Sequence, residues 1–272
     1  MALYVLKLED AKLHVSKGNR KIGKGIWAFS TLPGNKDNLL YVKNKGLLTT
    51  VHGTCSKYCT DCFNNGCYAV RDAKLHSNVT IKAWGENTLL LRHDPKQLFA
   101  MINTFITEKN AKYLETKDEK YHRVCTWRWH VSGEIETLEQ LELMNEVATK
   151  HPEVMFSVYT KSFDILDDYL TKHGEHGFAS NFVVNVSQWH HVADAFLQKH
   201  PGVFNVFEYD DSNLKDCEMS NEDKGRLTKV PHCPAVTSDG HHRLDKDGNP
   251  VTCDHCKRCY TKTGHATAVY AH

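Results

Sequence analysis

No stretch of this 272-residue sequence is apolar enough to cross a membrane, because none approaches the roughly 18 apolar residues that a spanning helix needs. The first fifteen residues, MALYVLKLEDAKLHV, carry charges too early for a signal peptide. The net charge is only +1, so no overall basic field favours nucleic acid, and there is no acidic tail. These absences predict a cytoplasmic protein with no membrane partner.

Cysteine, in contrast, is abundant, with ten residues in the chain. Thiols stay reduced in the cytoplasm, so clustered cysteines there indicate metal binding rather than disulfides. Eight of the ten fall into two groups. The N-terminal cysteine group consists of Cys55, Cys59, Cys62 and Cys67, and the C-terminal cysteine group of Cys233, Cys253, Cys256 and Cys259.

Strands and helices alternate regularly in the middle of the chain. Apolar alternation and helical spacing predict strands at 123–132, 154–160, 182–187 and 203–209, with helices at 137–151, 162–174 and 190–200 between them. Further parallel strands are expected near residues 46–51 and 88–92. This pattern predicts an α/β protein, either a partial (β/α) barrel related to the TIM barrel or a parallel sheet with helices.

The flanking regions differ from this core. The first fifty residues are expected to be rich in β-structure, with a hairpin or bent strand at 38–51. A short helix is predicted at 70–76, and Asp94 before Pro95 is predicted to cap a helix over 94–110. We therefore divide the chain into a β-rich segment (1–54), a (β/α) core carrying the N-terminal cysteine group (55–230) and a cysteine-rich segment (231–272).

The C-terminal segment has too few apolar residues for a core of its own, so it is expected to fold around a metal or stay disordered. Its C-x2-C-x2-C run, joined by Cys233 before Pro234, can supply four thiolates to zinc or to a [4Fe–4S] cluster. The absence of a second C-x2-C knuckle favours iron–sulfur. Zinc remains the alternative metal.

The N-terminal group begins with the spacing C-x3-C-x2-C, which resembles that of radical S-adenosylmethionine enzymes. The resemblance implies three thiolates on a [4Fe–4S] cluster, with one iron left open for a substrate or for S-adenosylmethionine. The segment HVSGEIE resembles the Gly-Gly-Glu segment of that family through Gly133 and Glu134, although Ser132 replaces a glycine and Asp61 replaces a usual aromatic residue. Cys67 is available to close the cluster.

Six motifs in the same order also resemble the gene product 88 domain of phage and mobile-element proteins. They are NRKIGKGIWAFSTLPG, GCYA, WHVSGEI, FSVYTKS, CPA and CDHCKRC, spread over residues 19–259. This resemblance implies a phage-encoded, cysteine-rich iron–sulfur α/β protein in a host cell. It also implies Cys67 as a ligand beside Cys55 and either Cys59 or Cys62, which overlaps with the radical-enzyme set but differs from it.

Polar residues at the ends of successive strands complete the predicted site. His130, Glu134 and Lys161 are the candidate catalytic residues. Candidate cofactor-binding residues are Gly133, Glu134, Asn185 and Glu208. Strand alternation places Trp127 and Trp129 on one face, as core residues, and Arg128 and His130 on the other.

The function expected from these features is that of an iron–sulfur redox or radical-type enzyme. An N-terminal cluster at the barrel mouth would act on a small-molecule substrate or exchange electrons with a donor, beside an auxiliary C-terminal cluster. Two alternatives remain open. One is a zinc-stapled phage protein without catalysis that binds nucleic acid or protein through Lys257, Arg258 and Lys262, although the net charge does not support nucleic acid. The other is a two-cluster electron carrier.

Overall fold

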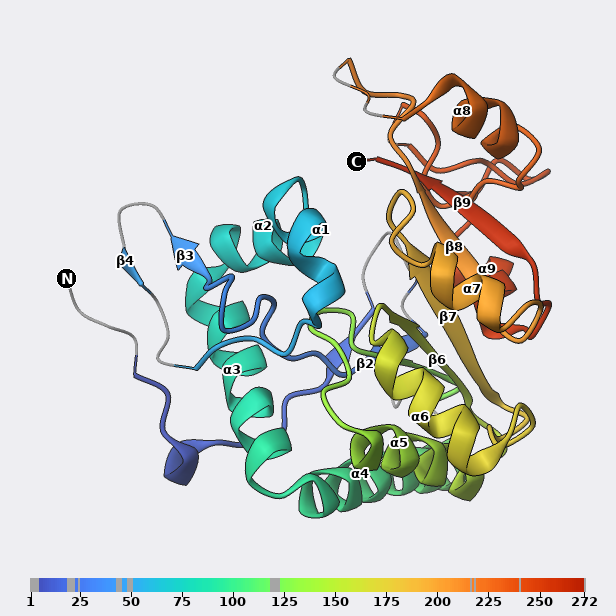
Figure 1. Cartoon of the computed structure of the whole chain (residues 1–272). Coiled ribbons are helices and arrows are strands. Elements are labelled where there is room, and N and C mark those ends of the chain that lie inside the picture. The colour runs from blue at the N-terminus through green and yellow to red at the C-terminus, as the bar shows by residue number, and fades with distance from the viewer. Residues whose placement is uncertain are drawn as a thin grey trace.

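The computed structural model describes residues 5–18, 23, 25–42, 46–47, 51–117, 123–215, 217, 219–239 and 241–271. Within them, a seven-stranded sheet has the strand order β1-β2-β5-β6-β7-β8-β9 (Figure 1). The strands are β1 (Ser16–Lys17), β2 (Ile26–Ala28), β5 (Thr126–Trp129), β6 (Met155–Thr160), β7 (Phe182–Gln188), β8 (Asn205–Asp210) and β9 (Ala266–Tyr270). Only β1 runs antiparallel to its neighbour, which confirms the α/β class with a mostly parallel sheet.

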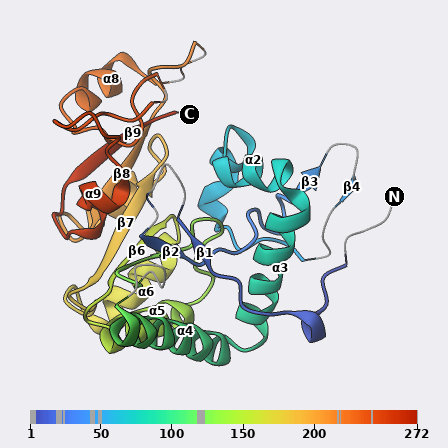
Figure 2. The ribbon, with the colours of Figure 1, turned by 180° about the vertical axis from the view of Figure 1, so that it is seen from behind.

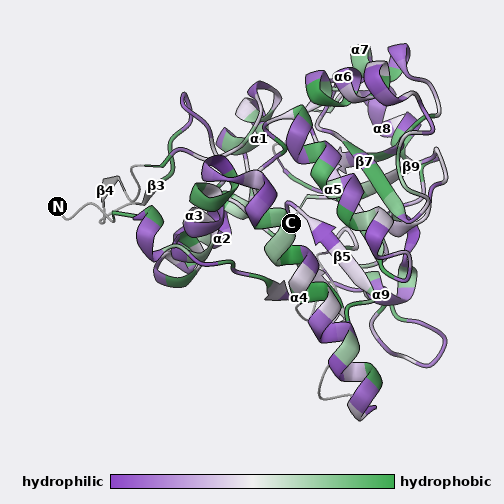
Figure 3. Cartoon of the chain, turned by 90° about the horizontal axis from the view of Figure 1, so that it is seen from below, coloured by the Kyte–Doolittle hydropathy of each residue, from purple (hydrophilic) through white to green (hydrophobic). Residues whose placement is uncertain are grey.

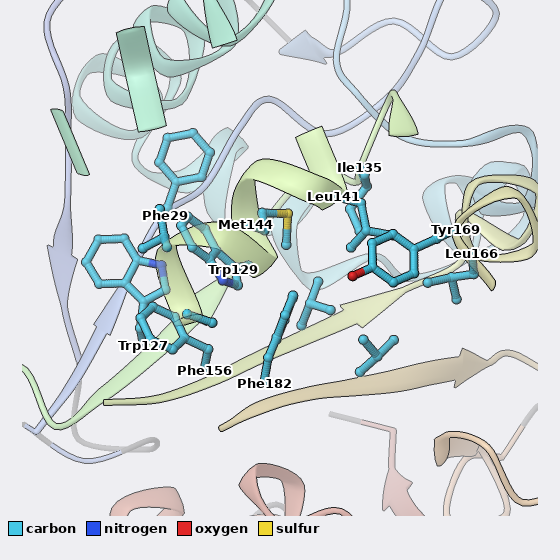
Figure 4. Packing of buried hydrophobic residues seen from close by; sticks show 14 of the residues in the cluster. Phe29, Trp127, Trp129, Ile135, Leu141, Met144, Phe156, Leu166, Tyr169 and Phe182 are labelled. Atoms are coloured by element: carbon cyan, nitrogen blue, oxygen red, sulfur yellow. The ribbon is translucent and has the colours of Figure 1, made fainter. Parts of the chain in front are cut away.

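Helices and strands alternate along the chain as the sequence predicts. The helices of this region are α4 (Pro95–Thr116), α5 (Leu138–Lys150), α6 (Phe163–His173) and α7 (Asp194–Lys199). Their apolar sides pack on alternate strand residues such as Trp129, Phe156 and Phe182 (Figure 4). Figure 3 shows hydrophilic and hydrophobic residues interspersed along α4 and α5, as expected of helices that press one side onto a core.

A second, smaller hydrophobic cluster lies around α3 and supports the N-terminal part of the chain. The elements here are the hairpin β3 (Tyr41–Val42) and β4 (Gly46–Leu47), the 3-10 turns η1 (Leu8–Asp10) and η2 (Lys57–Cys59), and the helices α1 (Thr60–Asn64), α2 (Tyr68–Leu75) and α3 (Ser77–His93). The hairpin predicted at 38–51 is confirmed in this small form, with residues 43–45 and 48–50 outside the described residues.

The two extra strands expected upstream of the core are wrong as members of the main sheet. Residues 88–92 belong to α3, because Ile81, Gly85, Thr88 and Leu91 recur at helical spacing and are buried. The segment near 46–51 contributes β4, which pairs only with β3. The main sheet instead gains β1 and β2 from the N-terminal region, which is expected to be β-rich without assigned strands, and β9, which the sequence pattern did not indicate.

The predicted cap of α4 is confirmed: Asp94 accepts a hydrogen bond from the backbone N–H of Gln97 at 2.9 Å, and Pro95 occupies the first turn. Replacing Asp94 by alanine leaves that N–H without its partner, so we expect the free energy of unfolding to fall by about 1 kcal/mol in urea titrations. Asp94→Asn keeps the accepting oxygen and is the matched control. Equal stability of the two variants would contradict the capping role.

The cysteine-rich C-terminal segment covers the helix-free face of the sheet. α8 (Asn221–Leu227) lies just upstream of this segment. The segment itself contains α9 (Cys253–Cys256) and the 3-10 turn η4 (Arg258–Tyr260), which contacts β6 and β7. Figures 1 and 2 both place α9 beside β7 and β8. Amide groups on the strands hold it there, since Asn185 donates to the carbonyl of Cys259 at 3.0 Å and Asn205 to that of Thr261 at 2.8 Å. No helix in the described part of the chain is long and apolar enough to span a membrane.

Candidate functional site

All eight cysteines of the two groups line a single cavity of about 330 Å³. The cavity also receives residues from the carboxyl ends of β5 to β9, for example Glu134 after β5, Lys161 after β6 and Trp189 after β7. Loops at this edge of a parallel sheet form the usual ligand crevice of α/β proteins. The structure thus brings together two groups of cysteines whose members lie more than 160 residues apart in sequence.

Backbone hydrogen bonds fix the loop of the N-terminal cysteine group at the sheet edge. The N–H of Cys55 donates to the carbonyl of Gly34 at 2.9 Å, and the N–H of Gly34 returns a bond to the Cys55 sulfur at 3.1 Å. Cys59 and Cys62, one turn apart on η2 and α1, are both buried. Two bonds at Cys55 therefore hold the start of the loop, and the short helical turns that follow place Cys59 and Cys62 next to it.

The four thiols of the N-terminal group interact in pairs. Cys59 contacts Cys55 and Cys62, and Cys62 also contacts Cys67. Hydrogen bonds from Cys59 and Cys67, aided by the ammonium of Lys161, hold the pKa of Cys62 well below its usual value. Cys67 therefore lies within the group rather than apart from it. Among the described residues, no three His, Cys, Asp or Glu side chains gather as ligands of one metal ion.

Glu134 connects the turn after β5 to the end of β6. Its carboxylate accepts hydrogen bonds from the hydroxyl of Thr160 at 2.6 Å and the N–H of Lys161 at 3.1 Å, and lies 3.7 Å from the Cys59 sulfur. Its own N–H donates to the hydroxyl of Thr54 at 2.8 Å. Burial raises the pKa of Glu134 to about 7, against the lowering influence of Lys161 and Thr160. This residue ties the cysteine loop to two strands.

Lys161 is a buried cation that faces the N-terminal group. Its ammonium donates to the hydroxyl of Ser187 at 3.0 Å and lies 6.0 Å from the centre of the Trp189 ring. Burial acts to lower the pKa of Lys161, but the negative charges of Cys62 and Cys59 raise it above its ordinary value. The side chain therefore keeps its positive charge inside the cavity.

The turn that follows β5 has an unusual backbone. His130 has φ +48° and Gly133 has φ +77°, and a Cβ on Gly133 would lie 2.0 Å from the hydroxyl oxygen of Thr31. Only glycine fits at position 133. The presence of glycine before Glu134 is therefore explained by packing as well as by the predicted function. The imidazole Nδ1 of His130 lies 3.3 Å from the Thr31 oxygen, while its Nε2 is buried without a partner. Burial lowers the pKa of His130 to about 3, so the ring is neutral.

Two predicted cofactor-binding residues do not line the cavity. Asn185 donates to the carbonyls of Val158 and Cys259, which anchors η4 on the sheet. Glu208 is buried and forms an ion pair with Arg226 at 2.6 Å. Their side chains hold neighbouring segments in place, and their assignment to a cofactor stays a prediction.

The C-terminal cysteine group comes from two segments that meet at the cavity. Cys253 and Cys256 lie on α9, and Cys259 follows on η4. Cys233 is fixed beside β9 by the bond from its N–H to the carbonyl of Ala268 at 2.7 Å. Burial raises the pKa of Cys253 to about 12 and that of Cys259 to about 11. Thiols in this environment lose their protons only when a cation, such as a metal, stabilises the thiolate.

Sequence reasoning did not assign several side chains that line the cavity. Arg128, Tyr159, Trp189 and Tyr209 project from the helix-free face or the ends of β5 to β8. Arg128 had one visible signal, because strand alternation already placed it opposite the core tryptophans. The aromatic residues carried none, since an isolated aromatic on a strand is typical of a core.

Comparison with protein families gives one match, the model for gene product 88, over residues 13–262. No curated protein and no solved structure matches the chain.

Proposed function

The chain belongs to the gene product 88 family, and we propose that it is an iron–sulfur protein whose two cysteine groups hold two clusters at one cavity. We infer that it acts in the host cytoplasm as a redox or radical-type enzyme. The observation that carries the proposal is that both groups line the same cavity at the carboxyl edge of the sheet. A cluster at the N-terminal group would then carry out the chemistry, and a cluster at the C-terminal group, in the same cavity, would supply electrons.

The donor set of the N-terminal group fits a cluster. Its four thiols form a chain of contacts from Cys55 through Cys59 and Cys62 to Cys67. The N–H of Gly34 donates to the Cys55 sulfur, and Lys161 brings a buried positive charge. In the described part of the chain the ammonium of Lys161 bonds to Ser187 and contacts the thiol of Cys62, and no carboxylate forms a salt bridge with it. Since a buried charge is costly without a partner, thiolates bound to iron are suitable counter-charges for it.

When bound, such a cluster supplies single-electron transfer, and an iron without a protein ligand offers a position for substrate or S-adenosylmethionine. The chain's own residues define the surroundings of that position. Glu134 fixes the cysteine loop against β6, and Gly133 lets the backbone pass close to Thr31. Neutral His130 lines the cavity and has a ring nitrogen without a hydrogen-bond partner. By the resemblance of this segment to radical enzymes, Gly133 and Glu134 are the proposed contacts for the methionine amine.

The test is metal and sulfide analysis of the protein purified without oxygen. Two [4Fe–4S] clusters predict a brown protein with about eight iron and eight sulfide per chain. Electron paramagnetic resonance of the reduced protein is expected to change on adding S-adenosylmethionine. A colourless protein with stoichiometric zinc would overturn the proposal in favour of the zinc-stapled alternative. An unchanged spectrum would overturn the open iron and make all four N-terminal cysteines ligands, as in an electron carrier.

A further inference from the structure

One side chain in the cavity is charged and has no acceptor for its hydrogen bonds. Arg128 projects from the helix-free face of β5, and its guanidinium carbon lies 4.3 Å from the centre of the Tyr159 ring. Its Nε is inaccessible to solvent and has no hydrogen-bond partner. No residue in the described part of the chain accepts a hydrogen bond from its side chain or forms an ion pair with it. A guanidinium has five N–H donors in a planar fork, so this is a large unmet demand.

Other partnerless polar atoms line the same cavity. The indole Nε1 of Trp189, the imidazole Nε2 of His130 and the hydroxyl of Ser132 are all buried without a hydrogen-bond partner. His130 and Ser132 are 3% and 2% exposed, so solvent does not satisfy them either. Buried polar groups are nearly always paired in proteins, and unpaired ones concentrated in a cavity indicate a missing ligand.

The charge and shape of the wall restrict what that ligand is. Glu134 is the only carboxylate among the described residues that line the cavity, and the protein itself already holds it by hydrogen bonds. The cations on the wall are Arg128, Lys161, Lys257 and Arg258. Beside Arg128 the wall is aromatic: Trp189 stacks on Tyr209 with ring centres 3.7 Å apart, and Tyr159 meets Phe207 edge to face at 4.8 Å.

We propose that this end of the cavity binds a small organic carboxylate, with the acid group on Arg128 and a flat apolar body against the aromatic wall. This names the substrate class of the proposed enzyme, and as a statement about catalysis it rests on that proposed function. The fork of Arg128 matches the two coplanar oxygens of a carboxylate. The N–H of Trp189 is a further donor at the same wall. A cavity of about 330 Å³ is at the small end of ligand sites.

The experiment is equilibrium dialysis of radiolabelled benzoate against the protein purified without oxygen. Benzoate is expected to bind saturably, and benzamide, which has the same shape without the charge, to compete at least about tenfold more weakly. Arg128→Met is expected to weaken benzoate binding by at least about tenfold. Arg128→Lys, which keeps the charge but not the fork, is expected to fall between the two.

Lys257→Met is the matched control, because it removes a cation from the exposed rim of the same cavity. It is expected to bind benzoate almost as the unaltered protein does. Trp189→Phe keeps an aromatic ring at this position but removes the N–H together with the five-membered ring, and provides a second probe should Arg128→Met fold poorly by circular dichroism. We expect it to weaken benzoate binding by less than Arg128→Met does.

Three results would overturn the inference: no saturable benzoate binding, full benzoate affinity in Arg128→Met, or tighter binding of phenyl phosphate than of benzoate. Iron and sulfide are measured on the same samples. Normal iron content without benzoate binding rejects the carboxylate site and leaves the proposed function standing. Benzoate binding that depends on Arg128 in a protein without iron rejects the proposed function and keeps the site.

Discussion

A variant with Cys59 and Cys62 both changed to alanine is expected to keep only about half of the iron and sulfide of the unaltered protein, because each cysteine group holds one cluster. The matched variant, with Cys253 and Cys256 changed to alanine, is expected to lose the other half. Double replacements are needed, since three remaining thiolates still suffice to hold a cluster. Iron, sulfide and the reduced electron paramagnetic resonance spectrum are measured for each variant.

The two variants should differ in their effect on folding. The N-terminal loop is fixed by backbone bonds to the strand-end segment around Gly34, so its loss of metal leaves most packing intact. The segment that carries the C-terminal group has few buried apolar side chains, for example Val236 and Tyr260, and a metal would supply much of its folding energy. We therefore expect protease to cut the Cys253/Cys256 variant between residues 240 and 265 much faster than the Cys59/Cys62 variant.

Cys125→Ala is the control, because this exposed thiol belongs to neither group. It is expected to keep all of its iron and its resistance to protease. If one double variant kept its full iron content, the proposal of two clusters would be wrong and the corresponding group would hold no iron. If the metal lost from the C-terminal variant were zinc, that group would be a staple beside a single cluster.

The alternating core could be predicted closely because its signals are local. The strand predicted at 154–160 is β6 (Met155–Thr160), and the helix predicted at 137–151 is α5 (Leu138–Lys150). Missed strands depend on distant partners. β2 has only three residues, too few to show the alternation of apolar and polar residues that identifies a strand. It pairs with β5, whose residues lie about a hundred positions later in the sequence. β9 is a five-residue stretch that follows the polar, cysteine-rich segment, and it becomes a strand by pairing with β8.

The candidate site shows the same division. Cysteine spacing alone identified eight residues that line the cavity, because chelating loops need ligands at short intervals. Spacing could not show that both groups face one cavity. The two groups meet because η4 crosses the helix-free face of the sheet, where Asn185 and Asn205 hold the segment that contains it. Asn185 looked like a cofactor contact from its position in β7, and only the bond to Cys259 reveals its anchoring role.

Changing Trp129 to alanine should produce the largest loss of stability among core variants. Trp129 is fully buried in the cluster between β5 and the helices (Figure 4). Its ring stacks on Phe156 at 6.0 Å between centres and contacts Phe99, Trp127 and Phe29. Removing such a side chain deletes the buried area and leaves a cavity, which typically costs about 3–5 kcal/mol of unfolding free energy. Thermal unfolding followed by far-ultraviolet circular dichroism measures the effect.

Trp129→Phe separates packing from hydrogen bonding at the same position. The indole N–H of Trp129 is buried without a partner, and an unsatisfied buried donor costs about 1–3 kcal/mol. Phenylalanine keeps most of the ring contact and removes that donor, so the loss from the smaller ring is partly offset. We therefore expect Trp129→Phe to unfold much closer to the unaltered protein than Trp129→Ala does. Equal destabilisation by the two variants would show that the N–H is satisfied, and that Trp129 is retained in the sheet for its nitrogen rather than its bulk.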